Sequence, residues 1–486
     1  MPLSRRHFLT TAAAPLLQPS RRNLVLIVID GQRAEMMGCA GNPILQTPNI
    51  DQLAARGVRF SQHYCVHGVC MPNRASLFTG RYPAAHGVSA NGVALPKSEQ
   101  TLAHILDAAG YATASAGKHH FEPMRAPGYP PRLNTGASYY GFREVHLTEN
   151  VPGEEYKAYV RRRFPNLTDA DLRRPGLPED ATEIHWITDQ TIDFLRRQSS
   201  PSRPFFAYCS FKDLTPPDAP PASFASLYKP ADIPPPVRRR GELDRKPPHY
   251  RQVYENQVKS GRYPNDEALP RLLAAYYGQM SFIDKQIGRI TAALAASGLA
   301  NNTLIALTAD HGLCLGDHWI WRHGPWLYDQ VLRIPFILYD PTLPSPRVVH
   351  HLTQTVDIAP TLLDLLGLPH QPGMQGLSLR PLVAGTANTP PRTSVYAEDI
   401  EADELKASGL DPAGFEVFAL RTAEWKYVHY PRQPHGELYD LRNDPNEFDN
   451  LWDDPARRST RNEYRHRLLE TVLAQRDPLP PRTASW

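Results

Sequence analysis

The sequence predicts an α/β fold built on a large, mostly parallel sheet flanked by helices. Aliphatic runs at Asn23 to Ile29 and Thr303 to Thr308 are nearly unbroken, which is typical of strands buried on both faces of a parallel sheet. Strand-like and helix-like patterns alternate between these two runs, and this alternation favours parallel pairing. A chain of 486 residues is also long enough for two domains.

The expected elements between the two runs follow in order. Helices are predicted over 47–57, 99–109 and 269–297, and strands over 111–116 and 205–211. In the longest helix, apolar residues recur at steps of four and three between Tyr276 and Leu294, so they form one buried stripe. Gly298 supplies the stop signal.

Two long segments, 122–184 and 213–264, are rich in Pro and Arg and fit neither pattern. Loops of this length inside a domain are usually functional or mobile. Their charge runs are Arg161 to Arg163 and Arg238 to Arg240. Such runs are most often solvated faces; the alternative is a rim that attracts a polyanionic substrate. Both segments follow strands, so we expect them at one edge of the sheet.

Composition narrows the function class. A formal net charge of only +3 gives no bulk electrostatic support for nucleic-acid binding. Five cysteines are too few and too scattered for a disulfide scaffold, and the sequence does not say whether two of them pair.

The N-terminus, residues 1–20, resembles a twin-arginine export signal. Arg5 and Arg6 precede a mildly apolar, Ala-rich stretch that ends near Gln18, and a signal of this type is an address rather than an anchor. The alternative is a frayed basic tail. The stretch is far shorter than the roughly 20 residues that span a bilayer, and no other transmembrane candidate is found. We therefore expect export to the periplasm or the extracellular space.

The segment from Val69 to Arg81 reads VCMPNRASLFTGR and is the first candidate for chemistry. Pro72 suits the first turn of a helix, so Cys70 is expected at a helix N-terminus, where free amides favour anions. Arg74, four residues on, can reach the same spot. The alternative is an ordinary buried or reactive cysteine.

Two acids form the second candidate. Asp30 follows the first aliphatic run, and Asp310 and His311 follow the second. Open α/β sheets bind ligands at the carboxyl ends of their strands. Carboxylates together with an imidazole suit a divalent cation such as Ca²⁺ or Mn²⁺.

The Cys70 segment resembles the C-x-P-x-R signature of type I, formylglycine-dependent sulfatases of the alkaline phosphatase-like superfamily. Five further motifs resemble that family in the same order: TPNID from Thr47, YPAAHG from Tyr82, GKHH from Gly117, DHG from Asp310 with LGDH from Leu315, and ELYDL from Glu437 with Asp444-Pro445. The resemblance implies a catalytic domain over 21–385 and a smaller C-terminal α+β subdomain over 386–486.

The resemblance also implies roles. Cys70 would be oxidised to formylglycine by a formylglycine-generating enzyme, and its hydrated aldehyde would attack sulfur. The resulting sulfo-enzyme would lose sulfate and regenerate the aldehyde. The metal, Ca²⁺ first and Mn²⁺ second, would be held by Asp30, Cys70, Asp310 and His311. Arg74 and Lys118 would offset charge on the transferring group, and His120 or His323 would transfer a proton.

Three departures from the family pattern affect the site. Asp30 is followed by Gly31-Gln32 instead of a second Asp; this resembles the branch that includes choline-sulfatase and phosphonate monoester hydrolase relatives, and it removes one metal carboxylate. A family Pro-His pair reads Leu214-Thr215, so a sulfate-binding His is missing. A family Gly-Lys pair reads Arg322-His323. The expected substrate-binding residues are therefore Lys118, His120, Arg322 and His323.

Three functions stay open at this point. The first is an exported sulfatase acting on a sulfated small molecule or oligosaccharide, with a carbohydrate ester expected; Lys118 and His120 favour it. The second is a phosphonate monoester or phosphodiester hydrolase, or a choline-sulfatase-like enzyme, favoured by the lone Asp30. A choline ester would need an aromatic or acidic cage, which the sequence neither shows nor excludes. The third is a binding protein without turnover, disfavoured by the complete nucleophile and acid set. Residues 317–321 are expected to serve loop packing.

Overall fold

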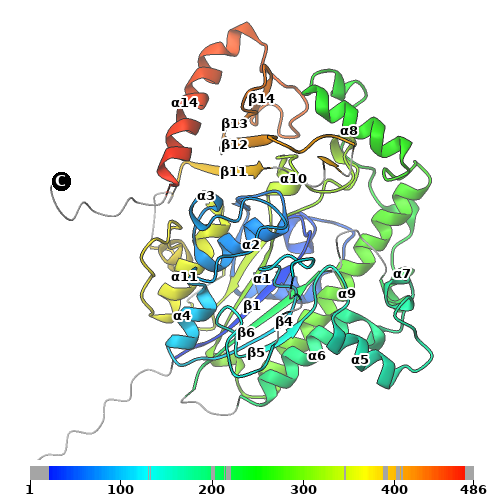
Figure 1. Cartoon of the computed structure of the whole chain (residues 1–486), viewed down its shortest axis with the longest axis vertical. Helices are drawn as coiled ribbons and strands as arrows, with labels where there is room; N and C mark the ends of the chain where they lie inside the picture. Colours follow the sequence, from blue (N-terminus) through cyan, green and yellow to red (C-terminus); the bar gives the residue numbers. More distant parts are fainter. Residues whose placement is uncertain are drawn as a thin grey trace, which may run out of the picture.

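The structure is a computed structural model that describes residues 21–127, 129, 131, 133–198, 203–212, 214, 220–343, 346–386, 392–400, 405–406 and 409–476. The predicted export signal, residues 1–20, and Thr215 lie outside the described residues. A large sheet with helices on both sides forms most of the molecule, and a second, smaller sheet carrying a long helix lies at one end (Figure 1).

The large sheet has eight strands in the order β5-β4-β6-β1-β7-β8-β2-β9. Their bounds are β1 Asn23–Ile29, β2 Val58–Phe60, β4 Ala112–Gly117, β5 Glu144–Leu147, β6 Phe205–Phe211, β7 Thr303–Ala309, β8 Phe336–Tyr339 and β9 Arg347–Val349. The run from β5 to β7 is parallel throughout, whereas β8 is antiparallel to both of its neighbours. Ile29 pairs with Ala309 in register, so Asp30 and Asp310 emerge together at one edge.

Alternate residues of β1 belong to two different cores, which confirms burial on both faces. Val25, Ile27 and Ile29 pack with α1 (Pro48–Arg56), α6 (Glu183–Arg196) and α9 (Ala268–Ala296). Leu24, Leu26 and Val28 pack with α2 (Cys70–Thr79), α4 (Leu102–Ala108) and α11 (Ile358–Leu366). The sheet is therefore a buried middle layer, as the aliphatic runs predict.

The predicted helices and strands between the two runs are present with small shifts. The largest shift is in α4, which begins at Leu102 instead of Glu99 because the Thr101 side chain caps the helix by accepting a hydrogen bond from the His104 N–H. The described catalytic part also contains several short helices and strands: β3 His63–Tyr64, α3 Pro83–His86, α7 Ala222–Ala225, α10 Asp329–Leu332, β10 Thr353–Gln354 and α12 Arg380–Ala384.

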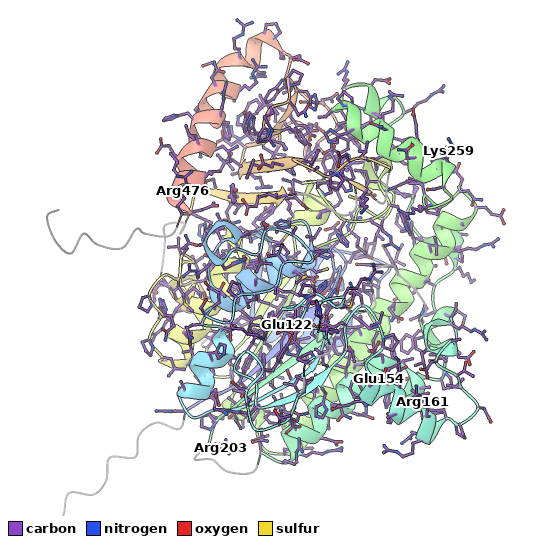
Figure 2. The ribbon with its side chains drawn as sticks, in the orientation of Figure 1. Glu122, Glu154, Arg161, Arg203, Lys259 and Arg476 are labelled. Carbon is purple, nitrogen blue, oxygen red and sulfur yellow. The ribbon has the colours of Figure 1, made fainter. Side chains whose placement is uncertain are left out.

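The two Pro- and Arg-rich segments are more regular than expected. The first contains β5, which extends the sheet beyond β4, and α5 (Glu154–Arg163); the second contains α8 (Pro248–Lys259). In α5, two glutamates occupy the first turn and Arg161 to Arg163 the last, an arrangement that complements the helix dipole. The side chain of Arg161 is 55% exposed and pairs with Asp169, at the periphery of the molecule (Figure 2). This Arg run is a solvated helix end.

The C-terminal part is an antiparallel sheet in the order β11-β12-β13-β14, with bounds Ser394–Ile400, Glu416–Thr422, Trp425–His429 and Gly436–Asp440. The helix α14 (Arg458–Ala474) packs against it through Tyr464 and Leu468. Among the described helices, we find none that combines the length and apolarity needed to cross a membrane.

Candidate active site

Cys70 is the first residue of α2 and is buried, with 4% of its surface exposed. The preceding residue, Val69, is extended, so the helix begins abruptly at the cysteine, as the Pro72 position predicts. Asn73 fixes this helix end. Its Oδ1 accepts the Val66 N–H at 3.0 Å, and its Nδ2 donates to the carbonyl of Asp310.

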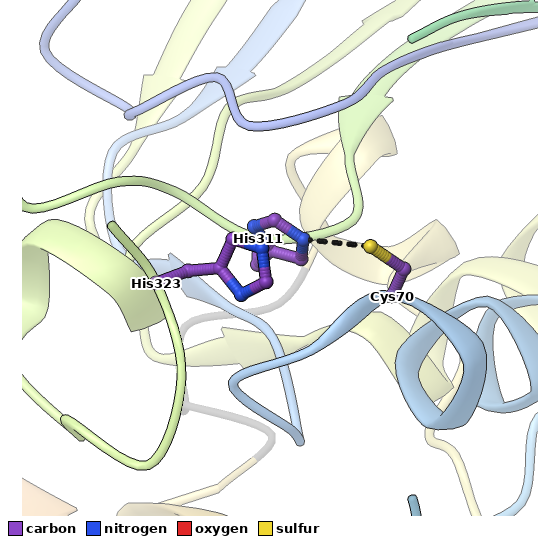
Figure 3. A group of neighbouring side chains, drawn as sticks. All are labelled: Cys70, His311 and His323. Carbon is purple, nitrogen blue, oxygen red and sulfur yellow. Dashed lines mark hydrogen bonds between the residues drawn. The ribbon is translucent and has the colours of Figure 1, made fainter. Parts of the chain in front are cut away.

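Four predicted metal ligands converge at the edge where β1 and β7 end. The ligand atoms of Asp30, Cys70, Asp310 and His311 all lie within 4.8 Å of one another, and all four side chains are buried. The Cys70 Sγ atom is 3.0 Å from His311 Nε2, as Figure 3 shows. This thiol stands where the oxygen atoms of a formylglycine would be. Two carboxylates and an imidazole around such oxygens suit a hard divalent cation.

Lys118 reaches the same cluster from the end of β4. Its Nζ lies 2.5 Å from Asp30 Oδ2 and 3.3 Å from Cys70 Sγ. Burial opposes the charge of this ammonium group, but Asp30 and Cys70 raise its pKa above the ordinary value. Gly117, the residue before it, has φ 104°, and a Cβ there would lie 1.9 Å from the Ser210 carbonyl oxygen. The close approach of β4 to β6 therefore requires glycine at this position.

The Arg74 guanidinium is fully buried and binds protein groups. Nε donates to Asp310 Oδ2 at 2.7 Å, and Nη2 lies 3.5 Å from Asp30 Oδ2. Nη1 donates to the Lys118 carbonyl, the Tyr208 hydroxyl and Ser210 Oγ at 2.8, 3.0 and 2.9 Å. Arg74 thus holds both acids of the cluster in place.

The electrostatics of the cluster favour a cation. Burial disfavours the charged form of the His311 imidazole, yet Asp310, Cys70 and Asp30 raise its pKa to about 10. Burial also opposes ionisation of Asp310, but Arg74 and His311 lower the pKa of this carboxyl. The acids are therefore ionised, and positive charge is strongly stabilised between them.

The two other predicted histidines flank the cluster as neutral groups. The His323 ring lies against His311 with a centroid distance of 4.0 Å and an angle of 38° between the ring planes (Figure 3). Burial, and then the charge of His311, lower the pKa of His323. His120 is 5% exposed and has a left-handed backbone with φ 58°; burial, Lys118 and Arg74 lower its pKa. Arg322 is exposed beside His323.

Several site residues escaped the sequence analysis. Tyr208 and Ser210, two residues apart on β6, both bind Arg74; their period-two spacing within a predicted strand is the signal that could have found them. Gln32 is fully buried, and its Oε1 has no hydrogen-bond partner among the residues that the structure describes. Glu149 binds the backbone N–H of His120 at 2.9 Å, and no pattern in the sequence points to it.

Residues 317–321 serve loop packing, as expected. Asp317 pairs with Arg33 at 2.8 Å. His318 Nδ1 lies 2.6 Å from Glu242, and its ring stacks on Tyr328 at 4.0 Å between centroids. The contact between His318 and Glu242 joins the loop after β7 to the second Pro- and Arg-rich segment. None of these contacts involves Cys70.

Comparison with known proteins identifies the family. The sulfatase family model matches residues 22–368, and a model described as N-sulphoglucosamine sulphohydrolase, C-terminal, matches 316–474. An arylsulfatase of Clostridium perfringens is 30% identical, over 88% of this chain and 90% of that protein. A choline-sulfatase of Rhizobium meliloti is 28% identical, over 89% and 83%.

The fold comparison points to the same superfamily. The crystal structure of a phosphonate monoester hydrolase from Agrobacterium radiobacter superposes with a TM-score of 0.80 at 27% identity, and the match covers 94% of this chain and 96% of that one. The family match over most of the chain and the cluster of buried side chains around Cys70 support the same assignment. The chain belongs to the sulfatase family and is a sulfuric ester hydrolase.

Proposed function

We propose that this enzyme is a formylglycine- and metal-dependent sulfatase that releases sulfate from a sulfated carbohydrate. One observation carries the proposal. The Sγ atom of Cys70, within C-x-P-x-R at the start of α2, lies at the point where His311, Lys118 and the two acids meet. Conversion of this side chain to formylglycine by a maturing enzyme would place a hydroxyl nucleophile at that point.

The residues fit a divalent cation, with Ca²⁺ as the first candidate and Mn²⁺ as the second. Asp30, Asp310, His311 and the modified Cys70 would hold it. Gln32, two residues after Asp30, has a buried carboxamide oxygen without a hydrogen-bond partner among the described residues, and it is a candidate for a further oxygen ligand of the kind that Ca²⁺ accepts. When bound, the cation would polarise a sulfate oxygen and favour the deprotonated nucleophile.

The other residues have separable roles. Lys118, 3.3 Å from Sγ, would offset charge on the transferring group, and the N-terminus of α2 adds to this effect. Arg74 acts mainly as a positioning residue for Asp30 and Asp310, because Nε and Nη1 donate to protein groups. Nη2 lies 3.5 Å from Asp30 and has no hydrogen-bond partner among the described residues, so it could also contact the transferring group. His120 and His323 are neutral imidazoles beside the cluster, suited to exchanging a proton with the leaving oxygen. Arg322 is the exposed candidate for contact with substrate.

A second candidate activity is hydrolysis of phosphonate monoesters or phosphodiesters. It is favoured by Gly31-Gln32 in the place of a second acid, since one fewer carboxylate leaves the site less negative toward a phosphoryl group. The likeness to a phosphonate monoester hydrolase over nearly the whole chain agrees with it.

One experiment separates these activities. The protein is produced with a formylglycine-generating enzyme, and the Cys70 peptide is examined by mass spectrometry. Aryl sulfate and aryl phosphonate esters are then assayed side by side, with Cys70→Ala as the matched control. We expect the aldehyde mass, faster turnover of the sulfate, and no turnover by the variant. An active enzyme with an unmodified thiol would contradict the formylglycine proposal, and faster phosphonate turnover would establish the second activity.

We also propose that the enzyme is exported. Arg5-Arg6 followed by an Ala-rich stretch supports recognition by a twin-arginine pathway. Arg5→Lys together with Arg6→Lys should retain the enzyme in the cytoplasm, which cell fractionation would detect. Unchanged export of this double variant would contradict the proposal.

A further inference from the structure

A cavity of about 460 Å³ lies at the carboxyl end of β5. Its described walls are largely apolar. They consist of Met124, Tyr129, Pro131 and Leu133, together with residues between Leu147 and Lys157 that include Val151. Figure 2 labels Glu122, just before the first of these two groups, and Glu154, within the second. The volume is within the range of small-molecule sites and exceeds what a sulfate group needs. We call this cavity the Glu149 pocket.

The fold places the Glu149 pocket at the sheet edge from which Lys118 emerges. Gly117 of β4 pairs with Leu147 of β5 in parallel register, so Lys118 and Thr148 leave the sheet at the same edge. Glu149, which lines the pocket, accepts the backbone N–H of His120 through Oε1 at 2.9 Å. Lys118, two residues before His120, contacts Cys70. Glu149 therefore connects the wall of the pocket to the segment that carries Lys118 and His120.

Glu149 is an unusual residue for such a wall. It is 2% exposed, and its Oε2 lacks a hydrogen-bond partner within the described part of the chain. Burial raises its pKa to about 7, against the opposing influence of the His120 N–H and Lys118. A buried carboxylate oxygen without a donor is costly, and a ligand that brings a charged N–H group would satisfy it with a strong hydrogen bond.

The other acids around the pocket already have cations. Glu154 pairs with Lys157 at 2.6 Å, and Glu155 with His146 at 2.8 Å. Among the described acids that line the pocket, Glu149 is therefore the one with a buried carboxylate oxygen that lacks a hydrogen-bond partner. Tyr129 adds an aromatic side chain to the same wall, and aromatic faces attract cations.

We propose that the Glu149 pocket binds the alcohol part of the substrate and selects an alcohol that carries an ammonium group. The inference rests on the proposed sulfatase function and deepens it by naming a substrate class. An amino sugar sulfate and a quaternary amino-alcohol sulfate share this chemistry. Of these two cations, only the primary ammonium has N–H groups that can donate to Glu149 Oε2, so the structure favours an amino sugar with a free amine. The paired, peripheral Arg161 does not contribute to this selection.

Substrate pairs that differ only in the amine test the proposal. kcat/KM is measured on glucosamine 6-sulfate, N-acetylglucosamine 6-sulfate, glucose 6-sulfate and choline sulfate. We expect the free amine to be preferred over its acetylated and deaminated counterparts by about tenfold or more, since a hydrogen bond between charged groups is lost in both. Choline sulfate should fall below glucosamine 6-sulfate. Preference for the acetylated or deaminated sugar would overturn the proposal. Preference for choline sulfate would overturn the inference that the ligand donates an N–H group to Glu149 Oε2.

Two variants locate the selection. Glu149→Gln should bring the ratio of amine to acetylated substrate close to one. Glu154→Gln, a matched change on an exposed glutamate that is held by Lys157, should leave the ratio unchanged. A ratio that survives Glu149→Gln would overturn the role of this residue.

A binding measurement keeps the proposal separate from folding and from turnover. Free glucosamine should bind the full-length Cys70→Ala protein more tightly than glucose or N-acetylglucosamine does, as measured by calorimetry. Equal binding of the three sugars would overturn the pocket's selectivity even where Glu149→Gln fails to fold. If the enzyme releases sulfate from no ester, the proposed sulfatase function is wrong. The calorimetric measurement still shows whether the Glu149 pocket binds the free amine selectively.

Discussion

Two clusters of buried charge in this molecule are built on opposite principles. In the first, Asp30, Asp310, His311 and Lys118 surround the Cys70 thiol. The second, which we call the interface cluster, joins the catalytic part to the C-terminal sheet. It consists of Glu437, Glu447, Lys426 and Asp329 with the tyrosines around them.

The charged groups of the interface cluster contact one another and the tyrosines around them. Glu437 accepts hydrogen bonds from the hydroxyls of Tyr250 and Tyr430 at 2.9 and 2.6 Å, and from Tyr439. Lys426 lies 2.6 Å from Glu447. Both carboxylate oxygens of Glu437 thus have donors, and among the described residues the groups that could hold a metal ion lie around Cys70 and not in the interface cluster. Burial of charge does not by itself identify an active site; convergence of ligand atoms on a reactive atom does.

The first and largest test removes an acid from the site. Asp310→Asn should lower kcat/KM by about 10³-fold or more and remove most bound metal, because the cluster loses a carboxylate ligand and the charge that orients Arg74. Elemental analysis and steady-state kinetics measure both effects. Glu437→Gln is the matched change in the interface cluster and should leave the activity of the folded protein intact. Full activity of chelator-treated, metal-free enzyme would contradict this difference.

The second test removes a cation from the interface cluster. Lys426→Met removes the cation that lies 2.6 Å from the buried Glu447, whereas Asp329 keeps its pairs with Arg421 and Arg333. The loss of the Glu447 pair should reduce the free energy of unfolding by about 3–5 kcal/mol. Urea denaturation measures the loss. Lys259→Met, at the exposed end of α8 (Figure 2), should change stability by less than about 0.5 kcal/mol. A stable Lys426→Met protein with lost activity would reverse the comparison.

The third test keeps the positive charge at position 74 but removes the planar guanidinium group. Arg74→Lys retains the positive charge but not the fork that binds Asp310, Lys118, Tyr208 and Ser210. Metal affinity should fall by roughly 10–100-fold, as measured by competition with a chelator. Arg161→Lys, an exposed counterpart, should leave the affinity unchanged. If Arg74→Lys binds metal like the wild type, the guanidinium geometry is unimportant.

The fourth and smallest test uses pH. Burial raises the pKa of Glu398 on β11 from 4.5 to about 7, although the Tyr396 hydroxyl favours its charged form. The folded state thus binds this proton more tightly than the unfolded state does. The resulting stabilisation is complete below pH 4.5 and is lost as the pH rises through about 7. Glu398→Gln should flatten this decrease in Tm between pH 5 and pH 8. An equally steep decrease in the variant would assign it to other groups.

The strands and the acids at their ends could be predicted from sequence because one local signal carries both. An unbroken aliphatic run predicts a buried strand, and the polar residue that ends it marks the sheet edge; Asp30 and Asp310 follow from this rule. Cys70 followed from the proline spacing of its helix. In each case the determining interactions lie within about ten residues of the functional one.

The second layer of the site could not be predicted because its determinants are distant. Glu149 contacts His120 only because β5 pairs with β4 across a segment that lacks local periodicity. Arg161 to Arg163 read as a charge run, whereas their place at the end of α5 depends on where that helix begins. The role of Arg74 required knowing that Tyr208 and Ser210 lie beneath it.

Arg74 also has a mechanical consequence. Its guanidinium group contacts residues that belong to or directly follow β1, β4, β6 and β7. One rigid planar side chain therefore links four parallel strands at the edge of the sheet that carries the active site. Sliding of any of these strands would break a contact of the buried guanidinium group, and would also disturb the contacts that this group makes with the other three strands. The edge should therefore open only when the entire sheet does. On heating, catalytic power and tertiary structure should disappear together, with no inactive but folded stage between them.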